Sequence, residues 1–129
     1  ASAVLFFGWL ASRLGWSCEG LVAQDGSRWG KARAKRGEVT LGMEPDLTMS
    51  APGLAGVTIE TASGMSITLN RGPGGLAATR ELPDGQTLSF TVMGASRGEA
   101  GILGEGIRQA LLRDPTYRPA LEKARVLAP

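Results

Sequence analysis

The sequence predicts an α+β fold: one antiparallel sheet of four or five meandering strands, with an N-terminal helix and C-terminal helices packed on one face. Three observations predict it, namely a helical apolar period at the start, a two-residue period in the middle and a second helical period towards the end. Short turn-forming links between the strands require antiparallel neighbours, because parallel pairs need long crossovers. A chain of 129 residues with 43% hydrophobic content fits one domain over residues 1–129.

The first predicted helix runs from Phe6 to Trp16 and has more apolar surface than one sheet can cover. One apolar stripe has helical spacing: Phe7, Leu10, Ala11 and Leu14. Phe6 and Trp9 continue the apolar surface around the cylinder, which predicts a second covering surface. That cover is either a binding partner or the long connection 17–37, and the sequence leaves both open.

The middle of the chain carries the strand signals. Residues 17–37 contain four glycines among polar groups, which predicts a long and partly irregular connection. Alternation of apolar and polar residues then predicts strands over 38–45, 57–60, 67–70 and 86–93. A run of strand length between turn residues predicts a further strand over 76–82. Ser63-Gly64 is a hairpin signal, and the glycine-rich run 72–75 is explained by a hairpin turn rather than by a phosphate-binding loop.

The C-terminal part returns to a helical period. Its apolar stripe is Ile102, Leu103, Ile107, Ala110 and Leu111. A short second helix is predicted to begin with Asp114 as N-cap and Pro115 in the first position. Its apolar residues are Tyr117, Leu121 and Val126.

Composition excludes several classes of function. The chain has no histidine, which removes the usual general base and the commonest transition-metal ligand, and we expect no catalytic site, no metal and no cofactor. The single cysteine, Cys18, cannot form an internal disulfide, which favours a reducing, cytoplasmic compartment; it is either a redox-sensitive thiol or a small buried apolar residue. A net charge of +2 disfavours nucleic acid as a partner. The apolar run 3–11 is too short to span a membrane.

One segment concentrates positive charge around Trp29. Its cations are Arg28, Lys31, Arg33, Lys35 and Arg36. Such a segment can hold a phosphate, a nucleotide or an acidic protein surface, which makes a small-anion or nucleotide sensor one candidate function. The alternative is a solvated loop without a ligand.

Several segments resemble a known family. The run Gly8-Trp9-Leu10-Ala11-Ser12-Arg13-Leu14 is similar to the GWLASR helix of the OpcA family, the glucose-6-phosphate dehydrogenase assembly proteins, in their carboxy-terminal domain. The hairpin 57–71, the strand through 77–80 and the end of the helix at 111–115 follow in the same order. The resemblance implies a non-catalytic bacterial protein that promotes assembly or allosteric activation of the dehydrogenase at the start of the oxidative pentose phosphate pathway.

The resemblance also implies further chain. The amino-terminal half of the family is absent, and the chain begins with Ala1 rather than methionine, so we expect a domain from the C-terminal part of a longer protein. Its partners are then the dehydrogenase and the rest of its own chain. Aromatic and arginine side chains dominate binding energy at protein contacts, which predicts a partner-binding surface made of Phe6, Trp9, Arg13 and Trp16.

Overall fold

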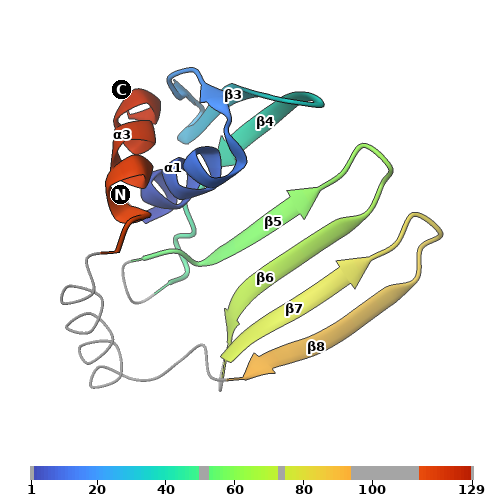
Figure 1. Ribbon diagram of the computed structural model, residues 1–129. Coiled ribbons are helices and arrows are strands. Elements are labelled where there is room, and N and C mark those ends of the chain that lie inside the picture. Colours follow the sequence, from blue (N-terminus) through green and yellow to red (C-terminus); the bar gives the residue numbers. More distant parts are fainter. Residues whose placement is uncertain (1, 50–52, 73–74, 94–113, 129) are drawn as a thin grey trace. The chain divides into compact units, whose positions relative to one another are not determined.

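The computed structural model describes residues 2–49, 53–72, 75–93 and 114–128. In these ranges the chain forms the helices α1 (Ser2–Leu14) and α3 (Tyr117–Leu127) and two antiparallel sheets of four strands each (Figure 1). The predicted α+β class is confirmed, with the strands divided between two sheets rather than gathered in one. The chain separates into two compact units, Ala1–Gly53 with Leu112–Pro129, and Leu54–Leu111.

The first unit contains the sheet that packs with both helices. Its strands are β1 (Ser17–Cys18), β2 (Val22–Gln24), β3 (Ser27–Ala34) and β4 (Gly37–Met43). The long strand β3 pairs with β4 along one edge and with β1 and β2 along the other.

The prediction of an irregular connection over 17–37 is therefore wrong. Gly26 lies in a turn with a φ of 80°, and Gly37, with a φ of 145°, is the first residue of β4. Asp25 also has a positive φ, of 50°, so Asp25-Gly26 forms the two-residue link between Gln24 and Ser27 that favours a hairpin. The sequence pattern predicts none of the three strands in this segment. The strands β1 and β2 have only two and three residues, too few to show a period, whereas β3 has eight.

The core of the first unit lies between the sheet and the helices. Four buried residues form its centre: Leu21, Ala32, Leu41 and Leu127. Val4 and Phe7 of α1 pack against this cluster, as does Trp16 beyond the helix. The inward face of α1 is thus Val4, Phe7, Gly8 and Ala11, whereas Leu14 of the predicted stripe is exposed.

The helices α1 and α3 lie side by side (Figure 1), and they are in close contact at Gly8. A Cβ atom added at Gly8 would lie 2.7 Å from the backbone nitrogen of Ala124 and 2.9 Å from its Cβ, and would also overlap the carbonyl oxygen of Ala120. Small residues on both helices therefore permit the two backbones to pack directly against each other. A side chain at Gly8 would push the helices apart.

Helix α1 ends in a glycine-dependent motif. Gly15 has a φ of 67°, and the Trp16 amide donates to the Ala11 carbonyl at 2.9 Å, which is the pattern of a Schellman C-cap. The Lys123 ammonium of α3 donates to the Trp16 carbonyl at 3.0 Å. The end of α1 is thereby fixed to α3 by a cation at the helix C-terminus, where positive charge is favourable.

The start of α3 differs from the prediction. The N-cap is Thr116 rather than Asp114, and no side-chain hydrogen bond caps the helix. The Asp114 carboxylate instead accepts hydrogen bonds from the Thr116 amide and hydroxyl, both at 2.8 Å, in a turn before the helix. The buried face of α3 is Ala120, Ala124 and Leu127, whereas the predicted apolar residues Tyr117 and Val126 are exposed.

The second unit is a four-stranded meander. Its strands are β5 (Gly56–Glu60), β6 (Ser66–Gly72), β7 (Gly75–Glu81) and β8 (Thr87–Met93), in that spatial order. All four lie within about two residues of their predicted positions. The Thr61-to-Met65 link contains the predicted Ser63-Gly64 turn, in which Gly64 has a φ of 85°.

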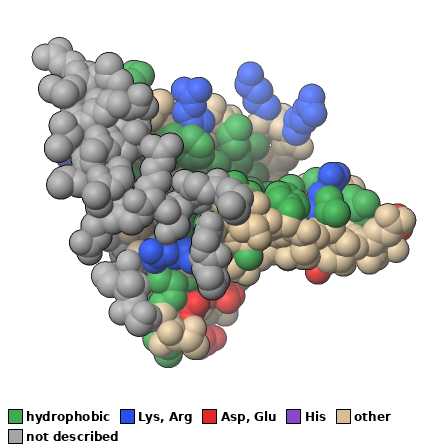
Figure 2. Space-filling view, turned by 90° about the horizontal axis from the view of Figure 1, so that it is seen from below, with side chains coloured by type: hydrophobic (Ala, Val, Ile, Leu, Met, Phe, Trp, Pro, Cys, Tyr) green, Lys and Arg blue, Asp and Glu red, His purple; other side chains and the backbone are tan. Residues whose placement is uncertain are grey.

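The register of this sheet separates two chemical faces. One face presents an aliphatic and aromatic row that runs Val57, Leu69, Ala78, Phe90, and the other a hydroxyl row that runs Thr58, Thr68, Thr79, Ser89. Figure 2 shows hydrophobic side chains along one side of this sheet and other side chains along the opposite side. The alternation of apolar and polar residues in the sequence therefore corresponds to an apolar face and a hydroxyl-bearing face of this sheet.

One predicted element lies outside the described residues, namely the helical stripe Ile102, Leu103, Ile107, Ala110 and Leu111. No helix in the described ranges is long and apolar enough to cross a membrane.

Candidate functional site

The outer face of α1 carries a stacked aromatic pair. Phe6 and Trp9 stack with their ring centroids 6.1 Å apart and their planes 27° from parallel. Their spacing follows from the helix, because residues three positions apart lie on neighbouring parts of one side. This side is opposite to Val4, Gly8 and Ala11, which face the core and α3.

Exposure distinguishes this pair from core aromatics. Trp9 keeps 41% of its surface exposed, Phe6 is half-buried, and neither packs against the buried cluster. Arg13 follows Trp9 by one helical turn and is exposed on the same side. We name the surface formed by Phe6, Trp9 and Arg13 the α1 outer face.

Trp16, the fourth predicted contact residue, has a different position. It follows the C-cap glycine, is half-buried and packs against the core cluster of the first unit. Its carbonyl accepts the Lys123 hydrogen bond described above. The structure therefore places Trp16 in the packing between α1, the sheet and α3, apart from the α1 outer face.

The α1 outer face combines features that characterise a protein contact surface. Stacked rings offer a rigid apolar area, which costs little conformational entropy when a partner covers it. The guanidinium of Arg13 supplies a fork of donors that suits a carboxylate. No residue of this face has the chemistry of a nucleophile or a general base, so the arrangement can bind but provides no catalytic step.

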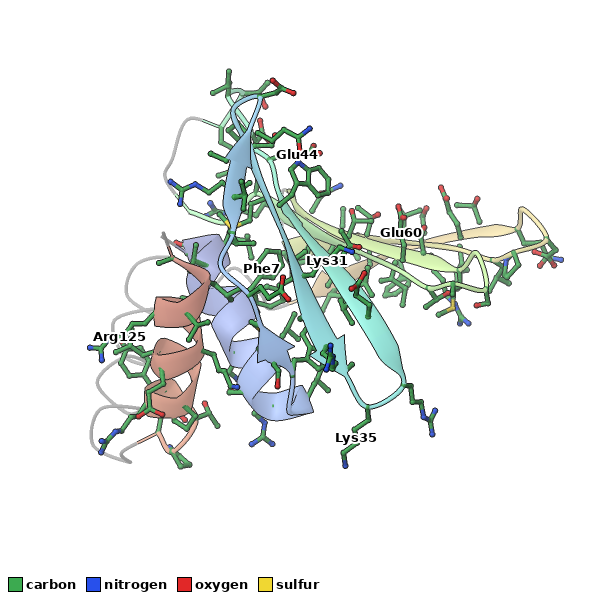
Figure 3. The ribbon with its side chains drawn as sticks, turned by 90° about the horizontal axis from the view of Figure 1, so that it is seen from above. Phe7, Lys31, Lys35, Glu44, Glu60 and Arg125 are labelled. Carbon is green, nitrogen blue, oxygen red and sulfur yellow. The ribbon has the colours of Figure 1, made fainter. Side chains whose placement is uncertain are left out.

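The basic segment lies on β3 and the turn after it. Alternation along the strand places Lys31 and Arg33 on the outer face of the sheet, whereas Arg28 shares the inner face with the buried Ala32. Lys35 and Arg36 follow in the β3–β4 turn, where Figure 3 shows Lys35 at the end of the hairpin. The five cations therefore do not converge on one point.

A carboxylate accompanies the segment. The Lys31 ammonium lies 2.7 Å from the Glu38 carboxylate across the hairpin, and both side chains are exposed. The hydrogen bond and the charge of Glu38 raise the pKa of Lys31, so this cation stays protonated and is engaged within the chain. Arg33 is also directly opposite Glu38 in the strand register. One acidic residue thus offsets part of the local charge.

The Trp29 side chain packs on β4, in a position that the sequence pattern does not reveal. Its ring lies over Gly42 of β4, since a Cβ atom at Gly42 would lie 2.9 Å from two of its ring carbons. Trp29 remains 39% exposed, and its other cross-strand neighbour is Val22 of β2. The relevant signal is the glycine opposite the tryptophan, which only the strand register identifies.

Cys18 is half-buried in β1 against the core cluster. Burial raises the pKa of its thiol, and the charge of the nearby Lys123 opposes this rise only in part. A raised pKa leaves less of the reactive thiolate at neutral pH. In the described ranges, no group of three or more His, Cys, Asp or Glu residues is placed to hold a metal ion.

Comparison with known proteins adds one finding. A family model that describes the C-terminal domain of a glucose-6-phosphate dehydrogenase subunit matches residues 1–121. Searches of curated proteins and of solved structures found no match. The matched segment includes α1 and all the described strands.

Proposed function

The chain belongs to the OpcA family, as a C-terminal domain of the glucose-6-phosphate dehydrogenase subunit, and from this premise we propose that it is a non-catalytic assembly and regulatory protein. In this role it binds glucose-6-phosphate dehydrogenase and activates it allosterically, as part of the oxidative pentose phosphate pathway of a bacterial cytoplasm. The rest of a longer chain joins it in the complex. Family membership supports the dehydrogenase as the partner.

The observation that carries the proposed binding role is the α1 outer face. An exposed Trp stacked on Phe, with Arg one turn away, has the composition of an interface centre, where a few aromatic and arginine residues supply most of the binding energy. We place the dehydrogenase contact there. The absence of histidine from the whole sequence agrees with a role that binds an enzyme and performs no acid–base chemistry itself.

The direct test mixes the chain with glucose-6-phosphate dehydrogenase from the same organism. We expect the two to co-elute in size-exclusion chromatography, and we expect kcat or KM of the dehydrogenase to change when the chain is added. Separate elution together with unchanged kinetics, for both this chain and the longer protein, would contradict the proposal.

A further inference from the structure

The outer edge of β8 is an unusual edge strand. Three strands of five or more residues lie at sheet edges in the described ranges, namely β4, β5 and β8. Strands at an edge carry unpaired backbone donors and acceptors, and proteins protect such edges with charge, proline or short length. Glu38 lies in β4 and Glu60 lies in β5.

Strand β8 has none of these protections. Its seven residues, Thr87–Met93, include no charged residue and no proline, and it pairs only with β7 among the described strands. Alternate side chains are large, apolar and exposed, with 60% of Leu88, 49% of Phe90 and 40% of Val92 accessible. Figure 1 shows β8 as the last strand of its sheet. A long, uncharged edge with apolar side chains favours the addition of another strand.

The sequence of β8 identifies the added strand, because it is complementary to itself. In an antiparallel pair of two copies centred on Phe90, the two Phe90 side chains are opposite each other and Leu88 is opposite Val92 of the second copy. On the other face, Ser89 is opposite Thr91. From Leu88 to Val92, every apolar residue thus meets an apolar one and every hydroxyl meets a hydroxyl. At the strand ends Thr87 is opposite Met93 of the second copy, and no like charges meet anywhere along the pair.

We propose that β8 is a homodimerisation edge, at which two copies of this chain join through antiparallel β8–β8 pairing. The contact has twofold symmetry, with the axis perpendicular to the sheet at Phe90, so both copies use the same residues. It joins the two sheets into one continuous sheet and extends the apolar face across the axis. The inference goes beyond the proposed function and does not depend on dehydrogenase binding.

Mass measurement tests the dimer. We expect light scattering on the isolated chain to give twice the chain mass of 13.4 kDa as concentration rises. The double variant Ser89→Lys and Thr91→Lys should return the mass to that of one chain, because each new cation meets another across the edge. The matched control is Thr58→Lys, which adds the same kind of charge to the same chemical face on β5, the opposite edge strand.

Circular dichroism should show unchanged strand content in these variants, which separates loss of pairing from loss of folding. A single-chain mass for the unmodified protein at all concentrations would overturn the proposal. A dimer that dissociates with Thr58→Lys and persists with the β8 variant would overturn it as well.

Disulfide trapping tests the register. Opposed residues of antiparallel strands have Cα atoms about 4.5–5.5 Å apart, which suits a disulfide. In a Cys18→Ala background, the double variant Ser89→Cys and Thr91→Cys should form a covalent dimer with oxidised glutathione. Each single variant should remain largely monomeric under denaturing electrophoresis, because its cysteine faces a hydroxyl residue. Equal cross-linking by a single variant would overturn the Phe90-centred register.

Discussion

At the level of single residues, Gly8 determines how closely α1 and α3 pack. Gly8→Ala adds helix propensity worth about 1 kcal/mol. The new methyl group would nevertheless overlap the backbone of Ala120 and Ala124. We therefore expect a net loss of about 1–3 kcal/mol in the free energy of unfolding, as is typical of overpacked sites. Urea denaturation of the variant and the unmodified chain measures this loss.

Gly15→Ala is the matched control for that experiment. A Cβ atom at Gly15 would meet no heavy atom within 4 Å, so only its φ of 67° is unfavourable for alanine. The expected cost is about 1–2 kcal/mol of left-handed backbone strain. A more stable Gly8→Ala variant would contradict the close helix contact.

Cys18 gives a second prediction at the residue scale. Because burial raises its thiol pKa, we expect slow alkylation by iodoacetamide at neutral pH and a rate that increases as pH rises above the ordinary thiol pKa. The reaction can be followed by mass spectrometry against free glutathione. Lys123→Met should raise the thiol pKa further and slow the reaction, because the opposing charge is removed. Alkylation faster than that of glutathione at neutral pH would contradict the burial of this thiol.

At the scale of elements, the β3–β4 hairpin determines what the basic segment can bind. Strand alternation separates Arg28 from Lys31, and Lys31 is paired with Glu38. We therefore expect sugar phosphates and nicotinamide nucleotides to leave the melting temperature unchanged. A ligand at 100 times its Kd would stabilise the fold by about 2.7 kcal/mol, which thermal shift assays detect readily. A shift that disappears with Lys35→Ala and Arg36→Ala would support the anion-sensor alternative.

The turn that precedes α3 predicts a pH response. Hydrogen bonds from the Thr116 amide and hydroxyl lower the pKa of Asp114 in the folded chain. The ionised carboxylate thus stabilises the folded state above the unfolded pKa, and this contribution is lost as pH falls through the depressed folded value. An NMR titration should show Asp114 ionising below an ordinary Asp, and Thr116→Val should return its pKa towards normal. An ordinary pKa in the unmodified chain would contradict the turn.

At the scale of the whole molecule, the proposed function predicts different roles for the two exposed tryptophans of the first unit. Trp9 and Trp29 have nearly equal exposure, of 41% and 39%, but only Trp9 lies on the α1 outer face. We expect Trp9→Ala to weaken dehydrogenase binding by about 2 kcal/mol or more, which is about 30-fold in Kd. Arg13→Ala should weaken it with little change in stability.

The matched control is Trp29→Ala, which should leave the affinity for the dehydrogenase nearly unchanged. Titration calorimetry measures both affinities, and thermal unfolding checks that each variant is folded. Equal loss of affinity from Trp9→Ala and Trp29→Ala, or equal unfolding by Trp9→Ala and Arg13→Ala, would contradict the assignment of the α1 outer face.

The sequence by itself determined the meander β5–β8, because β5, β6 and β8 show alternation, β7 is a run of strand length, and each turn has its own glycine or proline signal. It also determined that α1 has apolar residues on more than one side, and the GWLASR segment indicated the family. The aromatic residues of the candidate surface, Phe6 and Trp9, were identifiable from the sequence because helical spacing places them outside the stripe that includes Phe7 and Ala11.

Only the tertiary structure decided the strands β1 and β2, the position of Trp16 and the inward face of α1, because these features depend on contacts between residues far apart in the sequence. The strands β1 and β2 are too short to have a period and exist because β3 pairs with them. Trp16 was assigned to the core by its contact with the buried cluster, and the inward face of α1 by the close approach of α3 at Gly8. Burial and register are properties of packed neighbours, and a linear pattern does not specify which neighbours will meet.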